Sequence, residues 1–241
     1  MHTRSTVPPI GHHPSMMVGI ATRVGQIALS FVAIAAILFL AAGRLDWVWA
    51  WMFLGISLVS VMINGAFMLR HSPATIAERA QLGAMQRWDK VVSSLWAATQ
   101  YLALPLVAGL DLRFGWSPAL NTGWHALGVL VFTAGLIFSG WAMLSNAYFS
   151  TVVRIQHDRG HTVCRTGPYR VVRHPGYAGF MLQSLSIPVL LGSWWALPFG
   201  IVAVALMTIR TRFEDRLLHA ELDGYQDYAR DVRYRLVPGV W

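Results

Sequence analysis

The stretch GWHALGVLVFTAGLIFSGWAMLSNAYF, residues 123–149, contains no charged residue and decides the fold class of this chain. It lies within a longer charge-free run that covers residues 114–153. About 20 mainly apolar residues are enough for a helix to cross the hydrocarbon core of a bilayer. The stretch therefore predicts a membrane-spanning helix.

Four further charge-free runs repeat this pattern, at residues 24–43, 47–69, 91–110 and 175–209. Charged residues make up 12% of the 241-residue chain, and the mean hydropathy is +0.48. Soluble domains carry roughly 25% charged residues. We therefore predict an all-α, polytopic integral membrane protein with helices at 22–42, 47–69, 91–110, 123–149, 177–191 and 194–211. Because the last two are short and only Gly192-Ser193 separates them, they favour a tight hairpin, and five full spans are the alternative to six.

The basic residues predict the orientation of these helices. Seventeen of the 19 lysines and arginines fall in the N-terminal segment, the 70–90 and 150–176 connections and the C-terminal segment. Cytoplasmic loops carry the excess of basic residues, so both termini are predicted to be cytoplasmic. The protein would then be multi-pass, in the plasma or inner membrane of a prokaryote or the endoplasmic reticulum of a eukaryote.

The rest of the composition narrows the class of protein. The net charge of +8 is explained by this topology and by anionic headgroups, so no nucleic-acid partner is predicted. The single cysteine, Cys164, excludes a disulfide framework, and no metal site is predicted. We expect a flexible cytoplasmic tail at 1–21, N-terminal membrane helices at 22–145 and a functional core at 146–241.

The core contains a dense run of turn-forming and polar residues, RTGPYRVVRHPGYAG, at 165–179. Further along, Arg210 and Glu214 are four residues apart and share one helix face. The residues after Arg210 predict an amphipathic helix that folds back on the cytoplasmic side and ends near Gly224. We interpret Tyr225 and Tyr228 mainly as packing residues.

These two segments flank the hairpin and can close over one cytoplasmic pocket. Its arginines and histidine suit a carboxylate or phosphate, its acidic residues suit an ammonium or ribose hydroxyls, and its tyrosines suit a flat ring. S-adenosylmethionine needs all of these partners. A nucleotide satisfies the same pattern of charges.

Residues 146–238 resemble the isoprenylcysteine carboxyl methyltransferases and the related phospholipid methyltransferases. The resemblance is carried by GHTVCRTGPYRVVRHPGYAG (160–179), LLGSWW (190–195) and RTRFEDRLLHAELDGYQDYARDVRYRLVPG (210–239). It implies a membrane-embedded, S-adenosylmethionine-dependent enzyme without a Rossmann domain. The sequence agrees, because no GxGxxG follows a plausible strand.

Carried onto this sequence, the family pattern implies catalytic and cofactor-binding residues. Arg210 would approach the methyl acceptor, and Glu214 would bind the cofactor and take part in catalysis. For the upstream contact, Arg154 and Gln156 are alternatives, and Asp215 stands where a second glutamate is common. The implied cofactor-binding set is Gln156, His161, Thr162, Val163, Cys164, Tyr169, Arg173, His174, Pro175, Gly176, Tyr177, Glu214 and Asp215.

The resemblance implies methyl transfer to a lipid or prenylated acceptor that enters from the bilayer, while the cofactor enters from the cytoplasm. An isoprenylcysteine-type carboxylate is the acceptor we expect. A phospholipid amine and a small thiol are alternatives, as are an NADPH-dependent reductase of the sterol reductase type and a non-catalytic lipid-binding protein.

Overall fold

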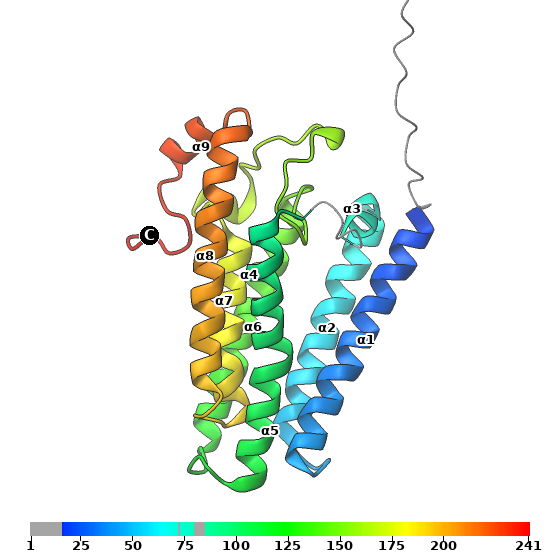
Figure 1. Cartoon of the computed structure of the whole chain (residues 1–241), viewed down its shortest axis with the longest axis vertical. Helices are drawn as coiled ribbons and strands as arrows, with labels where there is room; N and C mark the ends of the chain where they lie inside the picture. Colours follow the sequence, from blue (N-terminus) through cyan, green and yellow to red (C-terminus); the bar gives the residue numbers. More distant parts are fainter. Residues whose placement is uncertain (1–15, 72, 80–84) are drawn as a thin grey trace, which may run out of the picture.

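The computed structural model describes residues 16–71, 73–79 and 85–241, and within these ranges the regular structure is entirely helical. Residues 1–15 of the predicted tail lie outside the described residues. Residues 16–21 are helical, because α1 runs from Met16–Ala42 and so begins six residues earlier than predicted. Figure 1 shows the long helices side by side in one bundle, with α9 at one end.

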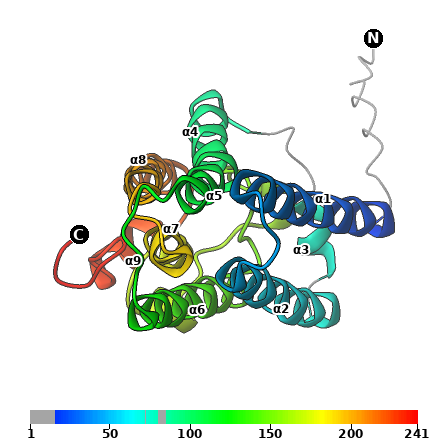
Figure 2. The same ribbon diagram turned by 90° about the horizontal axis from the view of Figure 1, so that it is seen from below.

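The first two helices form one side of this bundle. Helix α1 is antiparallel to α2 (Val48–His71), and the short α3 (Pro73–Glu78) follows directly. In Figure 2, α1 lies beside α5 and α2 lies beside α6, which is how this side joins the rest.

The third long helix is built from three segments: α4 (Arg87–Ala98), a π-helical turn η1 (Thr99–Ala103) and α5 (Leu104–Phe114). Pro105 lies at the start of α5 and cannot donate a backbone hydrogen bond, which accounts for the irregular turn before it. Gln100, inside that turn, accepts a hydrogen bond from Ser184 of α7 at 2.8 Å. The bulge thus gives the helix a buried polar contact with its neighbour.

Helices α6 (Thr122–Ser145) and α7 (Pro175–Leu191) are in close contact because glycines face each other. A Cβ atom added at Gly179 would come within 2.7 Å of Ser139 and 2.8 Å of the Gly135 carbonyl oxygen. In membranes, helices associate through such small residues because they have little hydrophobic advantage over lipid. Helix α7 lies between α6 and α8 in Figure 2.

Helices α7 and α8 (Leu197–Glu221) form the predicted hairpin. Gly192 ends α7 with a φ of 82°, a left-handed conformation that glycine adopts without a steric penalty. The predicted fold-back after Arg210 is wrong. Helix α8 continues straight to Glu221, because no glycine or proline interrupts it, and only then does α9 (Tyr225–Asp231) turn away.

Among the residues that the structure describes, four helices have the length and hydropathy of membrane spans: Met16–Ala42, Val48–His71, Arg87–Phe114 and Thr122–Ser145. Helix α7 has 17 residues and is therefore about 25 Å long, and α8 is charged beyond its first half. Both run alongside α6 in Figure 1. The protein is thus an all-helical integral membrane protein, and the count of five or six full spans stays a prediction.

Candidate functional site

The site begins where α6 ends, at the end of the bundle that carries α9. The predicted helix 123–149 is four residues too long, because α6 stops at Ser145 and Asn146 is extended. The chain then forms a mostly irregular layer over the helix ends, containing two short 3-10 turns, η2 (His157–Arg159) and η3 (Gly167–Arg170). Gly167 has a φ of 57°, and a side chain there would collide with Ser145.

One wall of the site is formed by the start of α7 and by the part of α8 that follows Arg210, which the sequence predicts to be cytoplasmic. The Tyr177 hydroxyl donates a short hydrogen bond to the Glu214 carboxylate. The His174 ring is parallel to the Tyr177 ring, with centroids 5.9 Å apart, and its Nδ1 lies 3.9 Å from Glu214 Oε1. Glu214 retains 23% side-chain exposure, so its carboxylate is oriented by the protein and still accessible.

Behind this wall, Asp215 is a buried hub. It accepts hydrogen bonds from Arg173 at 2.9 and 3.2 Å, from Arg235 at 2.7 Å and from the Tyr225 hydroxyl at 2.9 Å. His174 Nε2 lies 3.2 Å from Asp215 Oδ1. Burial alone would raise the pKa of Asp215, but the hydrogen bonds and charges of these partners outweigh it and hold the pKa far below its ordinary value. Asp215 therefore stays ionised and fixes His174 and Arg173 in place.

The C-terminal segment closes over this hub. The backbone N–H groups of Arg173 and His174 donate to the carbonyl oxygens of Tyr234 and Arg235, each at 2.9 Å. Trp241 packs in a cluster with buried Tyr177. The C-terminal segment is thus anchored to the site by backbone hydrogen bonds.

The opposite wall is the strip of residues 161–164 with the segment that follows α6. His161 Nδ1 accepts a hydrogen bond from the Gln156 backbone N–H at 3.3 Å, and its ring lies against Tyr148 with centroids 4.5 Å apart. Burial, assisted by the charges of nearby His157 and arginines, lowers the pKa of His161 to about 4. This imidazole is therefore neutral at pH 7.

Between the walls is a cavity of ≈ 780 Å³, counting the part that opens to solvent. Small-molecule sites enclose roughly 300–1,000 Å³. Of the predicted residues, those that line it are His161, Thr162, Val163, Cys164, Tyr169, Arg173, His174, Gly176, Tyr177 and Glu214.

Four predicted residues are not among the lining residues. Pro175 begins α7, and Asp215 supports the wall from behind. Gln156 is buried, where its Nε2 donates to the Tyr148 carbonyl at 2.8 Å and its Oε1 accepts from Arg159 at 2.6 Å. Of the two alternatives for the upstream contact, the structure brings Arg154 into the cavity wall.

Arg210, the fourth, is tied to a residue that sequence analysis missed. Its Nε donates to Asp89 Oδ1 at 2.9 Å, and its Nη2 donates to the Thr151 carbonyl at 2.8 Å. Asp89, on α4, has no exposed surface and also accepts the Val153 backbone N–H at 2.8 Å. The guanidinium carbon lies 5.3 Å from the Tyr177 ring centroid. Arg210 thus supports the cavity wall through Tyr177 with its charge already paired.

Aromatic and apolar residues that were not predicted as ligands complete the cavity. The Tyr228 hydroxyl donates to the Tyr169 carbonyl at 2.7 Å, so Tyr225 and Tyr228 pack as predicted and also line the cavity. Burial and the neighbouring Asp215 raise the pKa of Tyr225 well above its ordinary value. Further lining residues include Asn146, Tyr148, Phe149, Leu217, Leu218 and Leu222.

Comparisons with known proteins agree with the predicted family. Residues 126–220 match the isoprenylcysteine carboxyl methyltransferase (ICMT) family. Protein-S-isoprenylcysteine O-methyltransferase B of Arabidopsis thaliana is 25% identical over 148 residues, which are 58% of this chain and 75% of that protein. Methanethiol S-methyltransferase of Mycobacterium tuberculosis is 28% identical over 194 residues, 72% of this chain and 75% of that protein.

A solved structure of the eukaryotic intramembrane Ras methyltransferase ICMT covers 94% of this chain and 98% of its own, with 16% identity and a TM-score of 0.45. The family match and the curated relatives define the class of this protein, an integral-membrane methyltransferase. Within that class, residues 126–220 match the isoprenylcysteine carboxyl methyltransferase family, and they contain the 161–164 strip, His174, Tyr177 and Glu214.

Proposed function

We propose that this protein transfers a methyl group from S-adenosylmethionine to an isoprenylcysteine-type carboxylate on an acceptor that enters from the bilayer. The observation that carries the proposal is the Tyr177–Glu214 wall facing the 161–164 strip across one cavity, inside the segment that matches the family. The relative from Arabidopsis thaliana, a protein-S-isoprenylcysteine O-methyltransferase, supports the choice of acceptor.

The residues present fit the cofactor. Glu214 offers an accessible carboxylate to an ammonium group, and Arg154 and His174, from opposite walls of the cavity, offer nitrogen atoms to a carboxylate. The rings of Tyr148 and Tyr169 offer surfaces for a flat base. Electron-rich rings are also favourable neighbours for a sulfonium cation.

When bound, S-adenosylmethionine supplies an electrophilic methyl group on a positively charged sulfur. Its methyl carbon would pass to a carboxylate oxygen of the acceptor with loss of the C–S bond, which would leave a neutral ester and a neutral thioether sulfur. A carboxylate needs no general base. The chain therefore contributes mainly by alignment and by excluding water.

The hydrogen bond from Tyr177 fixes the Glu214 carboxylate, and the Asp215 hub fixes His174 beside it. Leu217, Leu218 and Leu222 provide an apolar lining that limits water. We propose Arg210 as a positioning residue for the acceptor side, acting through Tyr177, because Asp89 already neutralises its charge.

A small thiol is the second candidate acceptor. The relative from Mycobacterium tuberculosis is a methanethiol S-methyltransferase and is matched over 72% of this chain. A thiol must lose its proton to become a good nucleophile, and His174, 3.9 Å from Glu214, is the base that the site offers.

The test uses the full chain, purified and reconstituted in phosphatidylcholine vesicles with methyl-labelled S-adenosylmethionine. The acceptors, offered separately, are an S-prenylated N-acetylcysteine, phosphatidylethanolamine and a short alkanethiol. We expect a labelled methyl ester on the prenylated acceptor, identified by the release of labelled methanol in mild base. Label on the thiol alone would establish the second candidate, and label on none of the three would overturn the proposal.

A further inference from the structure

A second hollow lies beside the Asp215 hub. Its lining residues, all different from those of the cavity described above, are Asp215, Arg216, His219, Ala220 and Arg235. The hollow has a volume of ≈ 590 Å³, counting the part that opens to solvent. Three of these five side chains can carry a positive charge, while the carboxylate of Asp215 already accepts hydrogen bonds from Arg173, Tyr225 and Arg235. The hollow therefore suits an anion.

Helix α8 supplies a stripe of basic side chains to this hollow. Arg212, Arg216 and His219 are spaced four and three residues apart, so they lie on one face of the helix. Arg212 and Arg216 are exposed. His219 Nδ1 donates to the Asp215 carbonyl oxygen at 2.7 Å, which fixes the ring and leaves Nε2 for a ligand.

Arg235 completes the hollow from the C-terminal segment. Its Nε donates to Asp215 Oδ2 at 2.7 Å, and its guanidinium carbon lies 5.1 Å from the Trp241 ring centroid. The side chain is nonetheless 34% exposed. Because Asp215 holds the guanidinium through Nε, the two terminal amino groups are the donors that a ligand can use. A guanidinium fixed in this way suits a two-point contact with a phosphate group.

The C-terminal segment lies where the bundle changes from apolar to charged. Leu236 is buried in a cluster with Met207, which is near the end of the charge-free run 175–209, and Trp241 packs against this cluster. In Figure 1 the segment returns from α9 along α8, and Figure 2 places it on the outside of the bundle. Val240 is 79% exposed. Apolar and aromatic side chains beside basic ones are typical of a surface in contact with lipid headgroups.

We propose that Arg216, His219 and Arg235 bind the phosphate of an anionic phospholipid in the leaflet at the α9 end of the bundle. The occupant is a lipid because the C-terminal segment that carries Arg235 packs against residues of the apolar run. This site lies outside the cavity of the proposed function. It is joined to that cavity through Asp215, which contacts both Arg235 and His174. A bound phosphate would hold Arg235 and so stabilise the segment that closes over the hub.

The experiment uses the full chain, purified in a nonionic detergent, and native mass spectrometry to measure the binding of phosphatidylglycerol and of phosphatidylcholine. One arginine beside an anionic headgroup should contribute about fivefold in affinity. We therefore expect Arg216→Gln to weaken phosphatidylglycerol binding roughly fivefold, and the double variant Arg216→Gln, Arg235→Gln to weaken it roughly 25-fold. Binding of phosphatidylcholine, whose headgroup carries no net charge, should stay within about twofold. Arg230→Gln, a change of an exposed arginine on α9 outside the hollow, is the matched control and should bind as wild type does.

Arg216 is exposed, so the thermal midpoint of Arg216→Gln should equal that of wild type, and weaker lipid binding would then not come from unfolding. Equal affinity for phosphatidylglycerol in wild type and Arg216→Gln would overturn the site. An equal loss in Arg230→Gln would also overturn it, because the attraction would then come from the charge of the whole surface. Displacement of phosphatidylglycerol by millimolar glycerol 3-phosphate would mean that the hollow binds a soluble phosphate, and the lipid assignment would be wrong.

Discussion

Glu214 combines an accessible carboxylate with a fixed orientation, set by Tyr177. If it binds the ammonium group of the cofactor, Glu214→Gln should lower the affinity for S-adenosylhomocysteine roughly 10- to 100-fold, because a charge-assisted hydrogen bond becomes a neutral one. Calorimetry on the purified protein measures this directly. Glu221→Gln, an exposed glutamate on the same helix, is the matched control. Unchanged affinity in Glu214→Gln would remove Glu214 from the cofactor site.

The Asp89–Arg210 pair is buried, so each partner depends on the other. Removing one partner leaves an uncompensated buried charge, which typically costs about 3–5 kcal/mol. We expect Asp89→Ala and Arg210→Ala each to lower the thermal midpoint in detergent more than the double variant does. If the decreases in thermal midpoint of the two single variants simply add in the double variant, the ion pair does not couple α4 to α8.

The lowered pKa of His161 predicts that the stability of the folded protein depends on pH. Its pKa is lowered to about 4 in the folded protein from an ordinary value of 6.5. Between these values the unfolded chain binds more protons, so the stabilisation is complete above about pH 6.5 and is lost as the pH falls toward 4. His161→Gln should therefore show a smaller drop in thermal midpoint from pH 7 to pH 5 than wild type. Identical drops would contradict the assignment.

At the residue scale, the sequence predicts which residues of a local motif form the site, but it does not predict contacts between residues that are far apart in the chain. The order of Tyr169, His174, Tyr177 and Glu214 is visible as a motif, and the structure brings all four to one cavity. Asp89 is separated from Arg210 by 121 residues, and no periodicity predicts that contact. The 70–90 connection contains two acidic residues, Glu78 and Asp89, and nothing in the sequence marks Asp89 as the partner of Arg210.

At the scale of elements, the wrong helix ends in the sequence prediction come from the assumption that a helix is as long as its apolar run. The apolar run continues to Phe149, but Ala147 to Phe149 leave the helix so that Tyr148 and Phe149 can line the cavity. Conversely, the charges after Arg210 suggested a break in α8, although charged residues with good helix propensity do not end a helix. Its last turns are polar because they border the site.

The contact between α6 and α7 leads to a prediction about Gly179, the last residue of RHPGYAG. A methyl group there would come within 2.7 Å of the Ser139 backbone N, so the two helices would have to separate. Gly179→Ala should lower the thermal midpoint by several degrees, consistent with overpacking costs of about 1–3 kcal/mol. Gly55→Ala is the control, because nothing lies within 4 Å of a Cβ atom added there. An equal midpoint in both variants would mean that the close contact is not required.

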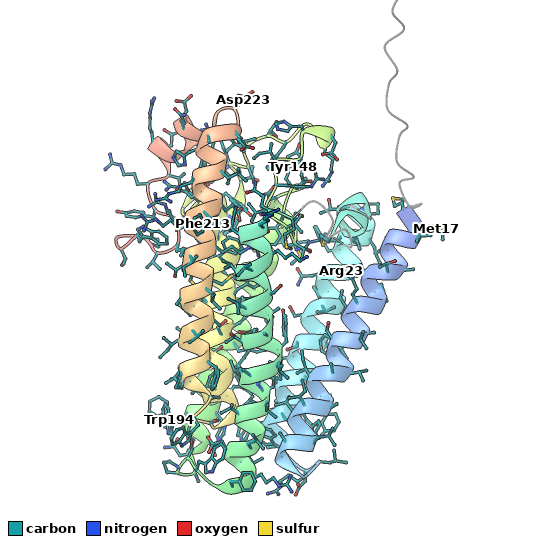
Figure 3. The ribbon with its side chains drawn as sticks, viewed as in Figure 1. Met17, Arg23, Tyr148, Trp194, Phe213 and Asp223 are labelled. Atoms are coloured by element: carbon teal, nitrogen blue, oxygen red, sulfur yellow. The ribbon has the colours of Figure 1, made fainter. Side chains whose placement is uncertain are left out.

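For the whole molecule, sequence predicted the helical bundle and its hairpin because burial in a membrane imposes long charge-free segments. The sequence did not predict which helices α1 and α2 pack against, since their lipid-facing and protein-facing surfaces are equally apolar. The basic residues nonetheless give the bundle two unlike ends. Figure 3 shows Trp194 at one end and Asp223 at the other, beside the site.

This polarity predicts the orientation in the membrane. In a Cys164→Ser background, which removes the single native thiol, Asp223→Cys and Trp195→Cys, the latter next in sequence to Trp194, place one label at each end. A membrane-impermeant maleimide added to intact cells or sealed right-side-out vesicles should label Trp195→Cys alone, and both after permeabilisation. The reason is that the Asp223 end carries most of the arginines, which the positive-inside rule assigns to the cytoplasm. Labelling of Asp223→Cys from outside would invert the topology. The cavity would then face away from the cytoplasm, where S-adenosylmethionine is made, and the proposed function would lose its cofactor supply.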